Sequence, residues 1–398
     1  MSEPFCLPSL DVTREALRGE RGEAVMAIAD RLLGVEPPKV TAKTADALRW
    51  FEDASAITAH DYVSIQTYWW PNADSADGLP YEHRDGRLSP EVSRYDRPRW
   101  DLHGDAVRAF VLATIASGEA RYAEAARRWV GVWCLDDATR MNPHLRHAQF
   151  LPGVNEGTLV GCIDFNTRAL SYVETIDLAC AAMPTVCDEA WRGGVDAWWS
   201  AMLDWLTSDA VRGWHDGRDN NLLVFYTLVV AGLADRFGRA EVVADRLDRV
   251  MRIVADQVEP DGRLPHELRR TRSFGYTTMT ILGLTLLARL GARHGRSLLD
   301  ADAGSGRSIR GAFEYVWGLA AGREAWPHPQ IEAVEWTRLL ATWLALPEDV
   351  RGRYPLDAVA HRVPAEVVKV PASVLCIPRL HPFFESAVAG HASPAAGS

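Results

Sequence analysis

A run of basic residues leads into a tyrosine in the C-terminal half of the chain. Arg269, Arg270 and Arg272 precede an apolar helical pattern that contains Tyr276. Arg272 and Tyr276 are four residues apart, so they share one face if both are helical. Guanidinium groups beside a phenol favour the phenolate and lower its pKa. A tyrosine in this setting could remove a proton, donate one, or do both, although a run of arginines is more often only a solvated surface.

A pair of amides opens a second helical pattern. Asn220 and Asn221 follow the turn-rich segment 213–218. An amide at the start of a helix can face an anion, and the helix terminus adds favourable polarity. Asparagine is also a common N-cap. We therefore expect one asparagine of the pair to cap the helix and the other to contact a ligand.

These segments belong to a longer series of short blocks. The blocks are Tyr68–Pro71, Asp77–Tyr81, Arg84–Gly86, Met141–Pro143, Gln149–Ile163, Asn220–Asn221 and Arg269–Tyr276. In this order and at this spacing they resemble the alginate lyase family of polysaccharide lyases, over about residues 60–345. The resemblance implies a helical toroid that cleaves uronic-acid glycans by β-elimination and needs no cofactor. The expected partner is a uronate-containing saccharide or small molecule.

β-Elimination sets clear requirements on such a site. The C5 proton of a uronate is only weakly acidic until the C6 carboxylate is neutralised. A base must then remove this proton, and an acid must protonate the departing O4. The resemblance assigns neutralisation to Asn221, Arg270 and Arg272. It makes Tyr276 the proton-transfer residue, and Glu267, in a further matching block, is expected to hold the guanidinium groups in place.

The chain departs from the family directly after the asparagine pair. The family pattern is Asn-Asn-His-Gly, whereas this chain has Leu222 and Leu223 after the pair. An aliphatic residue stands in place of the imidazole, so we expect the mechanism to depend more heavily on Tyr276. His147 occupies a position where the family often has tyrosine and could replace the missing imidazole. A single histidine in a loop is, however, more often an ordinary surface residue.

Other residues in or near the blocks are candidates for binding a sugar. Trp69 and Trp70 lie in a polar, turn-rich segment rather than on a helical stripe, so their faces could stack on a sugar ring. Most other tryptophans are expected to fill the core. The remaining candidates carry hydroxyl, amide, guanidinium or imidazole groups: Tyr81, Arg84, Asn142, Arg146, Gln149, Asn220, Tyr226 and His328.

Composition argues against several other functions. The net charge of −10 disfavours general binding to nucleic acid or to an anionic membrane. The six cysteines show no metal-ligand spacing and no His-Glu-x-x-His pattern occurs, so no metal is indicated. No basic stretch followed by an apolar one opens the chain, and no apolar run is long enough to span a membrane. We therefore expect a cytoplasmic protein.

Helical periodicity dominates the chain, so the predicted fold class is all-α. The helices alone would suit any large helical domain, and the resemblance favours a single α/α toroid. An entry helix over 12–34 precedes a segment rich in Pro, Gly and Asp, 35–104, which we interpret as a long irregular arm across the mouth of the toroid. The expected toroid helices span 105–117, 119–134, 166–184, 188–207, 220–237, 240–257, 276–294, 308–322 and 329–345.

These patterns predict a division of the chain into three parts. Residues 1–104 form the entry helix and arm, and residues 105–388 form the toroid. The small, polar segment 389–398 is expected to be a disordered tail. Two short strands are expected within 366–377, where β-branched residues gather.

Three functions remain open at this point. The chain could be a lyase that acts inside the cell on imported oligouronides. It could instead be a tailoring enzyme that performs an elimination on a small uronate-bearing metabolite. Because Leu222 lacks an imidazole, it could also be a degenerate homologue that binds glycan without cleaving it.

Overall fold

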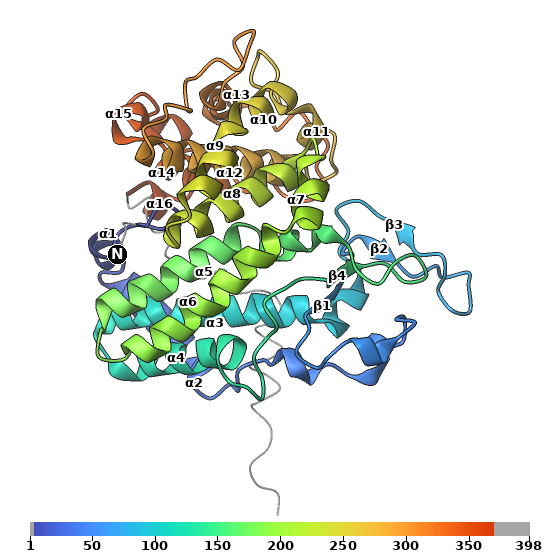
Figure 1. Cartoon of the computed structure of the whole chain (residues 1–398). Helices are drawn as coiled ribbons and strands as arrows, with labels where there is room; N and C mark the ends of the chain where they lie inside the picture. The colour runs from blue at the N-terminus through green and yellow to red at the C-terminus, as the bar shows by residue number, and fades with distance from the viewer. Residues whose placement is uncertain (1–3, 370–398) are drawn as a thin grey trace, which may run out of the picture.

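The computed structural model describes residues 4–369 and has the predicted all-α toroid (Figure 1). Successive long helices pack against one another and form the inner layer. These inner helices are α3 (Asp96–Ser117), α5 (Cys162–Ala182), α8 (Asn221–Arg236), α12 (Ser273–Arg293) and α14 (Thr337–Ala345). The helices packed on their outer side are α2 (Glu20–Leu33), α4 (Ala120–Cys134), α6 (Glu189–Leu206), α9 (Ala240–Asp248) and α13 (Ile309–Ala321). The remaining helices are α1 (Leu10–Ala16), α7 (Asp209–Asp216), α10 (Val250–Gln257), α11 (Pro265–Leu268), α15 (Glu348–Arg351) and α16 (Ala365–Lys369).

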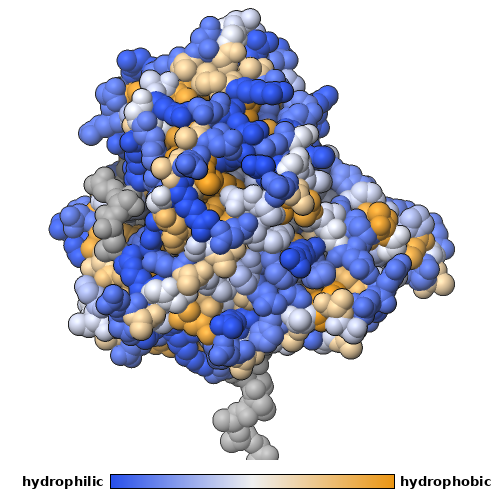
Figure 2. Space-filling model, in the orientation of Figure 1, coloured by the Kyte–Doolittle hydropathy of each residue, from blue (hydrophilic) through white to orange (hydrophobic). Residues whose placement is uncertain are grey.

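The inner helices form the core because apolar residues occur around nearly their whole circumference. Some of the buried hydroxyls within them bond to their own helix. In α12 the buried hydroxyls of Thr278 and Thr285 each donate to a carbonyl four residues back, at 2.8 Å. The outer helix α4 instead buries a single stripe at helical spacing: Tyr122, Ala126, Trp129, Val130 and Trp133. Figure 2 shows that hydrophobic residues on this face of the molecule occur in small groups between hydrophilic ones.

The arm lies beside one end of the toroid and has a small core of its own. It contains β1 (Val63–Ile65), β2 (Trp69–Trp70) and β3 (Glu82–His83). β2 and β3 form an antiparallel hairpin that projects on the right of Figure 1, and β1 pairs in parallel with β4 (His147–Phe150). The buried residues of this second core are Ala47, Phe51, Ile57, Val63, Ile65, Tyr81, Val92, Tyr95, Phe150 and Leu151.

Three predicted elements were wrong in part, and one of them is the helix expected over 329–345, which begins only at Thr337. Helix α3 begins at Asp96, so the residues between it and position 104 are helical and the arm ends earlier than expected. Pro98 lies in the first turn of α3, where its missing N–H has no helical acceptor. Residues 365–369 form α16 rather than a strand, and the rest of the predicted strand pair and the predicted tail lie outside the described residues. Among residues 4–369 no helix is long and apolar enough to cross a membrane.

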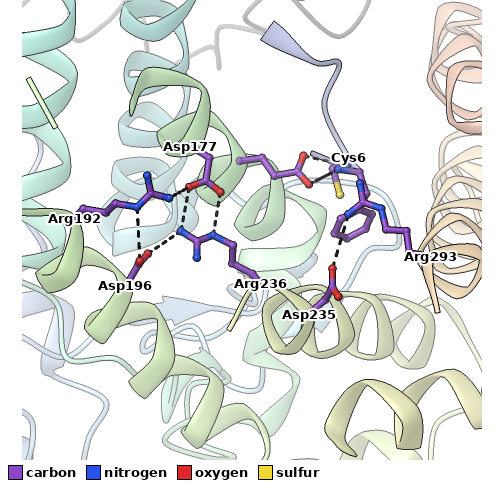
Figure 3. A network of polar contacts seen from close by, with 9 residues as sticks. Cys6, Asp177, Arg192, Asp196, Asp235, Arg236 and Arg293 are labelled. Atoms are coloured by element: carbon purple, nitrogen blue, oxygen red, sulfur yellow. Dashed lines mark hydrogen bonds and ion pairs between the residues drawn. The ribbon is translucent and has the colours of Figure 1, made fainter. Parts of the chain in front are cut away.

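The N-terminal strap, Phe5–Leu7, is fixed at the other end of the toroid by one buried carboxylate. Glu174 on α5 accepts hydrogen bonds from the backbone N–H groups of Phe5 at 2.7 Å, Cys6 at 3.0 Å and Leu7 at 2.7 Å. Figure 3 shows Cys6 of this strap with Arg293 near by. Burial raises the pKa of Glu174 to about 7, although the three backbone donors oppose that change. Glu174 is therefore an unusual titrating group within the core.

This raised pKa predicts a pH-dependent stability. The folded carboxyl binds its proton more tightly than the unfolded one, so its contribution to folding is most favourable at low pH and decreases as pH rises to about 7. The quantity to compare is the free energy of unfolding of wild type and of Glu174→Gln. The difference, wild type minus variant, should fall by up to about 3 kcal/mol as the pH rises from low values to about 7. Urea unfolding at a series of pH values measures the difference. Glu124→Gln, at an exposed position of α4, is the control, and a difference that stays constant with pH would contradict the raised pKa.

Candidate active site

Several ion pairs join the arm to the toroid, and one of them is formed by Asp85. Asp85, in the turn after β3, accepts hydrogen bonds from Nε and Nη2 of Arg270 at 3.0 and 2.5 Å. It also accepts one from the backbone N–H of Thr271 at 2.9 Å. Burial alone would raise the pKa of Asp85, but the hydrogen bonds from Arg270 and Thr271 lower it to about 2. The ionised carboxylate therefore holds the guanidinium of Arg270 in a fixed position.

The turn that carries Asp85 approaches the toroid very closely. Gly86 follows it with a φ of 72°, a conformation that favours glycine. A Cβ atom at this position would lie 2.4 Å from Oγ1 of Thr271 and 3.0 Å from Cγ of Arg272. Only glycine lets the turn reach the segment before α12 in this geometry.

Tyr276, in the first turn of α12, is hydrogen-bonded on both sides. Its hydroxyl accepts from Nη2 of Arg270 at 2.9 Å and donates to the hydroxyl of Tyr68 at 2.7 Å. The guanidinium carbon of Arg270 also lies 3.9 Å from the centroid of the Tyr276 ring. Two phenols and one guanidinium thus form a continuous chain from the arm to the toroid, which we call the tyrosine–arginine chain (Tyr68, Tyr276, Arg270).

The expectation of a lowered tyrosine pKa was wrong. Burial and the neighbouring Tyr68 raise the pKa of Tyr276, and Arg270 lowers it by less. The second expected guanidinium is directed elsewhere, because Arg272 pairs with Glu332. Tyr276 is therefore a neutral phenol in this arrangement.

One member of the asparagine pair caps the helix, as expected. The Oδ1 of Asn220 accepts from the backbone N–H of Leu222 at 3.1 Å and caps α8. The Nδ2 of Asn221 lies 3.0 and 2.9 Å from the two carboxyl oxygens of Glu267. Glu267 therefore holds an amide, and the expectation that it holds the guanidinium groups was wrong. Burial raises the pKa of Glu267, whereas its hydrogen bonds from Asn221 lower it.

The helices α7 and α8, around Leu222, contain one histidine, His215. Leu222 is half-buried, and the half-buried Leu223 packs against the main core. His215 is fully buried, its Nε2 donates to the carbonyl of Leu159 at 2.8 Å, and burial lowers its pKa to about 4. Its ring stacks on Tyr226 with centroids 4.3 Å apart. His215 is therefore a core residue.

Two tyrosines expected to bind substrate are buried instead. Tyr226 is 1% exposed and donates its hydroxyl to the carbonyl of Leu206 at 2.8 Å. Tyr81 is 6% exposed and packs edge-on against Trp50 in the core of the arm. Neither side chain presents a surface to a sugar, so both expectations were wrong.

The loop before β4 lies against the arm. Asn142 donates from Nδ2 to Asp61 at 2.7 Å, and the ring of His144 pairs with the same carboxylate at 3.1 Å. The half-buried His147 has its ring edge against Phe51. Within residues 4–369 no hydrogen bond or ring contact joins His147 to the tyrosine–arginine chain. The loop also carries Arg146, which is exposed.

Gln149 has a strained backbone beside a buried charge. Its φ is 54°, in the left-handed region, and such strain is found mainly at functional sites. Its Nε2 donates to Asp164 at 2.8 Å, and its backbone N–H donates to Ser64 at 2.8 Å. Arg97, in the first turn of α3, reaches Asp164 at 3.3 Å. Gln149 and Arg97 thus share the buried carboxylate of Asp164.

The aromatic hairpin is only partly open. Trp69 and Trp70 are half-buried, and Nε1 of Trp70 donates to the carbonyl of Arg87 at 2.9 Å. The guanidinium of Arg84 lies 4.9 Å from the Trp70 ring. Farther along the chain, His328 lies 2.6 Å from the hydroxyl of Tyr315, and burial lowers its pKa.

Sequence reasoning missed three residues that the structure places at this site. Tyr68 and Asp85 both occur in the matching blocks, and this was the one feature of the sequence that could have indicated a role for them. Their partners lie 208 and 185 residues away, so their roles required the fold. Arg97 lies outside every block and showed no distinguishing pattern.

An α/α toroid with an arm across one end is the architecture of a class of polysaccharide lyases. The chain belongs to the alginate lyase family, whose sequence model matches residues 52–326. The crystal structure of an alginate lyase from Bacteroides ovatus is 26% identical, with a TM-score of 0.81 over 93% of this chain and 99% of that chain.

Alginate lyase A1-III from Sphingomonas species A1 is more distant. Its crystal structure is 16% identical, with a TM-score of 0.43 over 82% of this chain and 88% of that chain. No curated protein sequence matches the chain.

Proposed function

We propose that the protein is a lyase that cleaves uronic-acid-containing saccharides by β-elimination at the tyrosine–arginine chain. The observation that carries the proposal is the contact of Tyr276 with both Arg270 and Tyr68, at 2.9 and 2.7 Å. A proton-transfer group and a fixed cation lie side by side there, as elimination next to a carboxylate requires. Membership of the alginate lyase family and the likeness to the Bacteroides ovatus enzyme support the substrate class.

Arg270 is the first residue proposed to bind the C6 carboxylate. A guanidinium has five N–H donors, and three of those on Arg270 are directed at Asp85 and Tyr276. Among the described residues the two donors on Nη1 are left for a substrate carboxylate, to which Nη1 can donate a charge-assisted hydrogen bond. Arg272 is a weaker candidate because it must first leave Glu332.

Asn221 is proposed to assist through Glu267. The carboxyl of Glu267 lies within hydrogen-bond distance of the Asn221 amide, and in its protonated form it can donate to Oδ1 of Asn221 once the amide turns over. That rotation directs Nδ2 of Asn221 away from Glu267 and towards a substrate carboxylate. The amide then adds a second donor to the one supplied by Arg270.

Tyr276 is proposed to transfer the proton in both steps. In one concerted step the neutral phenol gives its proton to O4 as the C4–O4 bond breaks, and its oxygen takes the C5 proton from the same face of the sugar. The tyrosine therefore ends the cycle as it began. Arg270 stabilises negative charge on the phenol oxygen, and Tyr68 can share its proton at 2.7 Å. Such a syn elimination does not require the imidazole that Leu222 replaces.

Incubation with defined uronides tests this function. Polymannuronate, polyguluronate, glucuronan and short oligouronides are supplied in turn, and the ultraviolet absorbance of the conjugated C4–C5 double bond is followed. At least one substrate should give the unsaturated product with wild type, and Tyr276→Phe should give none. Binding of an oligouronide without any product would favour the glycan-binding alternative, which the leucine at position 222 motivates. Absence of both binding and product would contradict the proposed substrate class.

A further inference from the structure

A cavity lies at the end of the toroid away from the arm. Its volume is about 410 Å³, within the range of small-molecule sites. Arg289, near the C-terminus of α12, forms part of its wall. Thirteen residues of α12 separate Arg289 from Tyr276, a distance of about 20 Å at the rise of an α-helix. The cavity is therefore distinct from the proposed catalytic site.

The charged residues of this cavity are all arginines. Arg108 from α3, Arg289 from α12 and Arg351 from α15 line it, and no aspartate or glutamate is among its lining residues. Within residues 4–369 no carboxylate forms an ion pair with Arg289 or Arg351. Burial and the charges of the neighbouring Arg293 and Arg351 lower the pKa of Arg289, although Glu174 opposes this. In the described part of the chain, this half-buried cation thus has no counter-ion in contact.

The neighbouring helices show how this fold otherwise treats buried arginines. In Figure 3, Arg192 and Arg236 flank Asp177, with oxygen–nitrogen distances of 2.8 and 3.0 Å. Arg236 also pairs with Asp196 at 3.0 Å. On that side of the N-terminal strap, Arg192 and Arg236 each form an ion pair with a carboxylate. On the side of Arg289 the neighbouring acid, Glu174, is occupied by the backbone of the strap.

We propose that this cavity binds a small organic anion that carries a carboxylate or phosphate group. Guanidinium forks match both groups and supply the charge complementary to them. The hydroxyls of Ser9 and Ser171 add polar contacts, and the side chains of Leu282, Leu286 and Leu344 provide apolar walls for the rest of the ligand. The site uses no residue of the tyrosine–arginine chain and is independent of the proposed lyase function.

Calorimetric titration of the full chain with three probes tests the site. The probes are inorganic phosphate, glucuronate and uncharged glucose. At least one anion should bind, glucose should not, and Arg289→Gln combined with Arg351→Gln should weaken anion binding by about tenfold or more. Arg289→Lys keeps the charge and should retain part of the affinity. Tighter binding of phosphate assigns a phosphate ester, and tighter binding of glucuronate assigns a carboxylate.

Three controls show whether anion binding depends on the arginines of this cavity. Arg252→Gln, whose native side chain is 87% exposed, should leave binding unchanged. Binding should persist in Arg270→Ala, which removes the cation of the catalytic site. Circular dichroism melting of each variant shows whether it is folded. Absence of binding by both anions to wild type, or equal affinity in the folded double variant, would overturn the proposal.

Discussion

Replacing Tyr276 by phenylalanine should abolish turnover on any uronide that the wild type cleaves. The change keeps the ring and its contact with Arg270 but removes the hydroxyl that joins Arg270 to Tyr68. Loss of a partly buried hydroxyl costs about 1 kcal/mol of stability, so the variant should remain folded. Initial rates from the absorbance of the unsaturated product, with thermal melting beside them, measure the two effects.

Tyr68→Phe is the matched comparison for this prediction. It removes the acceptor of the Tyr276 hydrogen bond but leaves the phenol next to Arg270. We expect a partial loss of turnover, smaller than that of Tyr276→Phe. If Tyr276→Phe kept most of its activity, the proton would be transferred elsewhere, and His147 would be the next residue to test.

Arg270→Ala should lower turnover by roughly 30- to 1000-fold, the effect of losing about 2–4 kcal/mol of transition-state stabilisation. The variant loses the cation proposed to hold the substrate carboxylate and the group that stabilises negative charge on Tyr276. It also leaves Asp85 without its partner, so melting must be measured with the rate. Steady-state kinetics on the best uronide give the change in kcat and KM separately.

Arg272→Ala provides the contrast within the same segment. Arg272 pairs with Glu332, and within residues 4–369 its side chain has no hydrogen bond to the tyrosine–arginine chain. Its removal should therefore change turnover far less. Equal losses in the two variants would show that both guanidiniums act on substrate. Unchanged turnover in both, and in the double variant, would remove the arginines from the mechanism.

The fold was largely predictable because helical periodicity and helix-end residues recur along the whole chain. The boundary of the arm was not, because Pro98 reads as a loop residue although the first turn of a helix tolerates it. For the site, the matching blocks indicated Arg270 and Tyr276 correctly as neighbours. Their environment was misjudged: burial dominates the pKa of Tyr276, and burial cannot be read from the spacing of charges.

Long-range partners account for most of the remaining errors. Glu267 is close to three arginines in the sequence, yet its carboxyl contacts Asn221, which is 46 residues away. Tyr226 and Tyr81 were chosen for their hydroxyl groups, and both are buried. A polar tip on an aromatic ring is as useful for satisfying a buried carbonyl as for binding a sugar.

The small core of the arm has a consequence for how the protein loses activity. Its buried residues form a cluster separate from the main core, and such clusters can open as cooperative units below the global unfolding free energy. Opening of this unit would carry Tyr68 and Asp85 away while the helices stayed intact. Loss of activity would then measure the opening of this unit and not the unfolding of the whole protein. A sample whose circular dichroism spectrum is still fully helical could already be inactive.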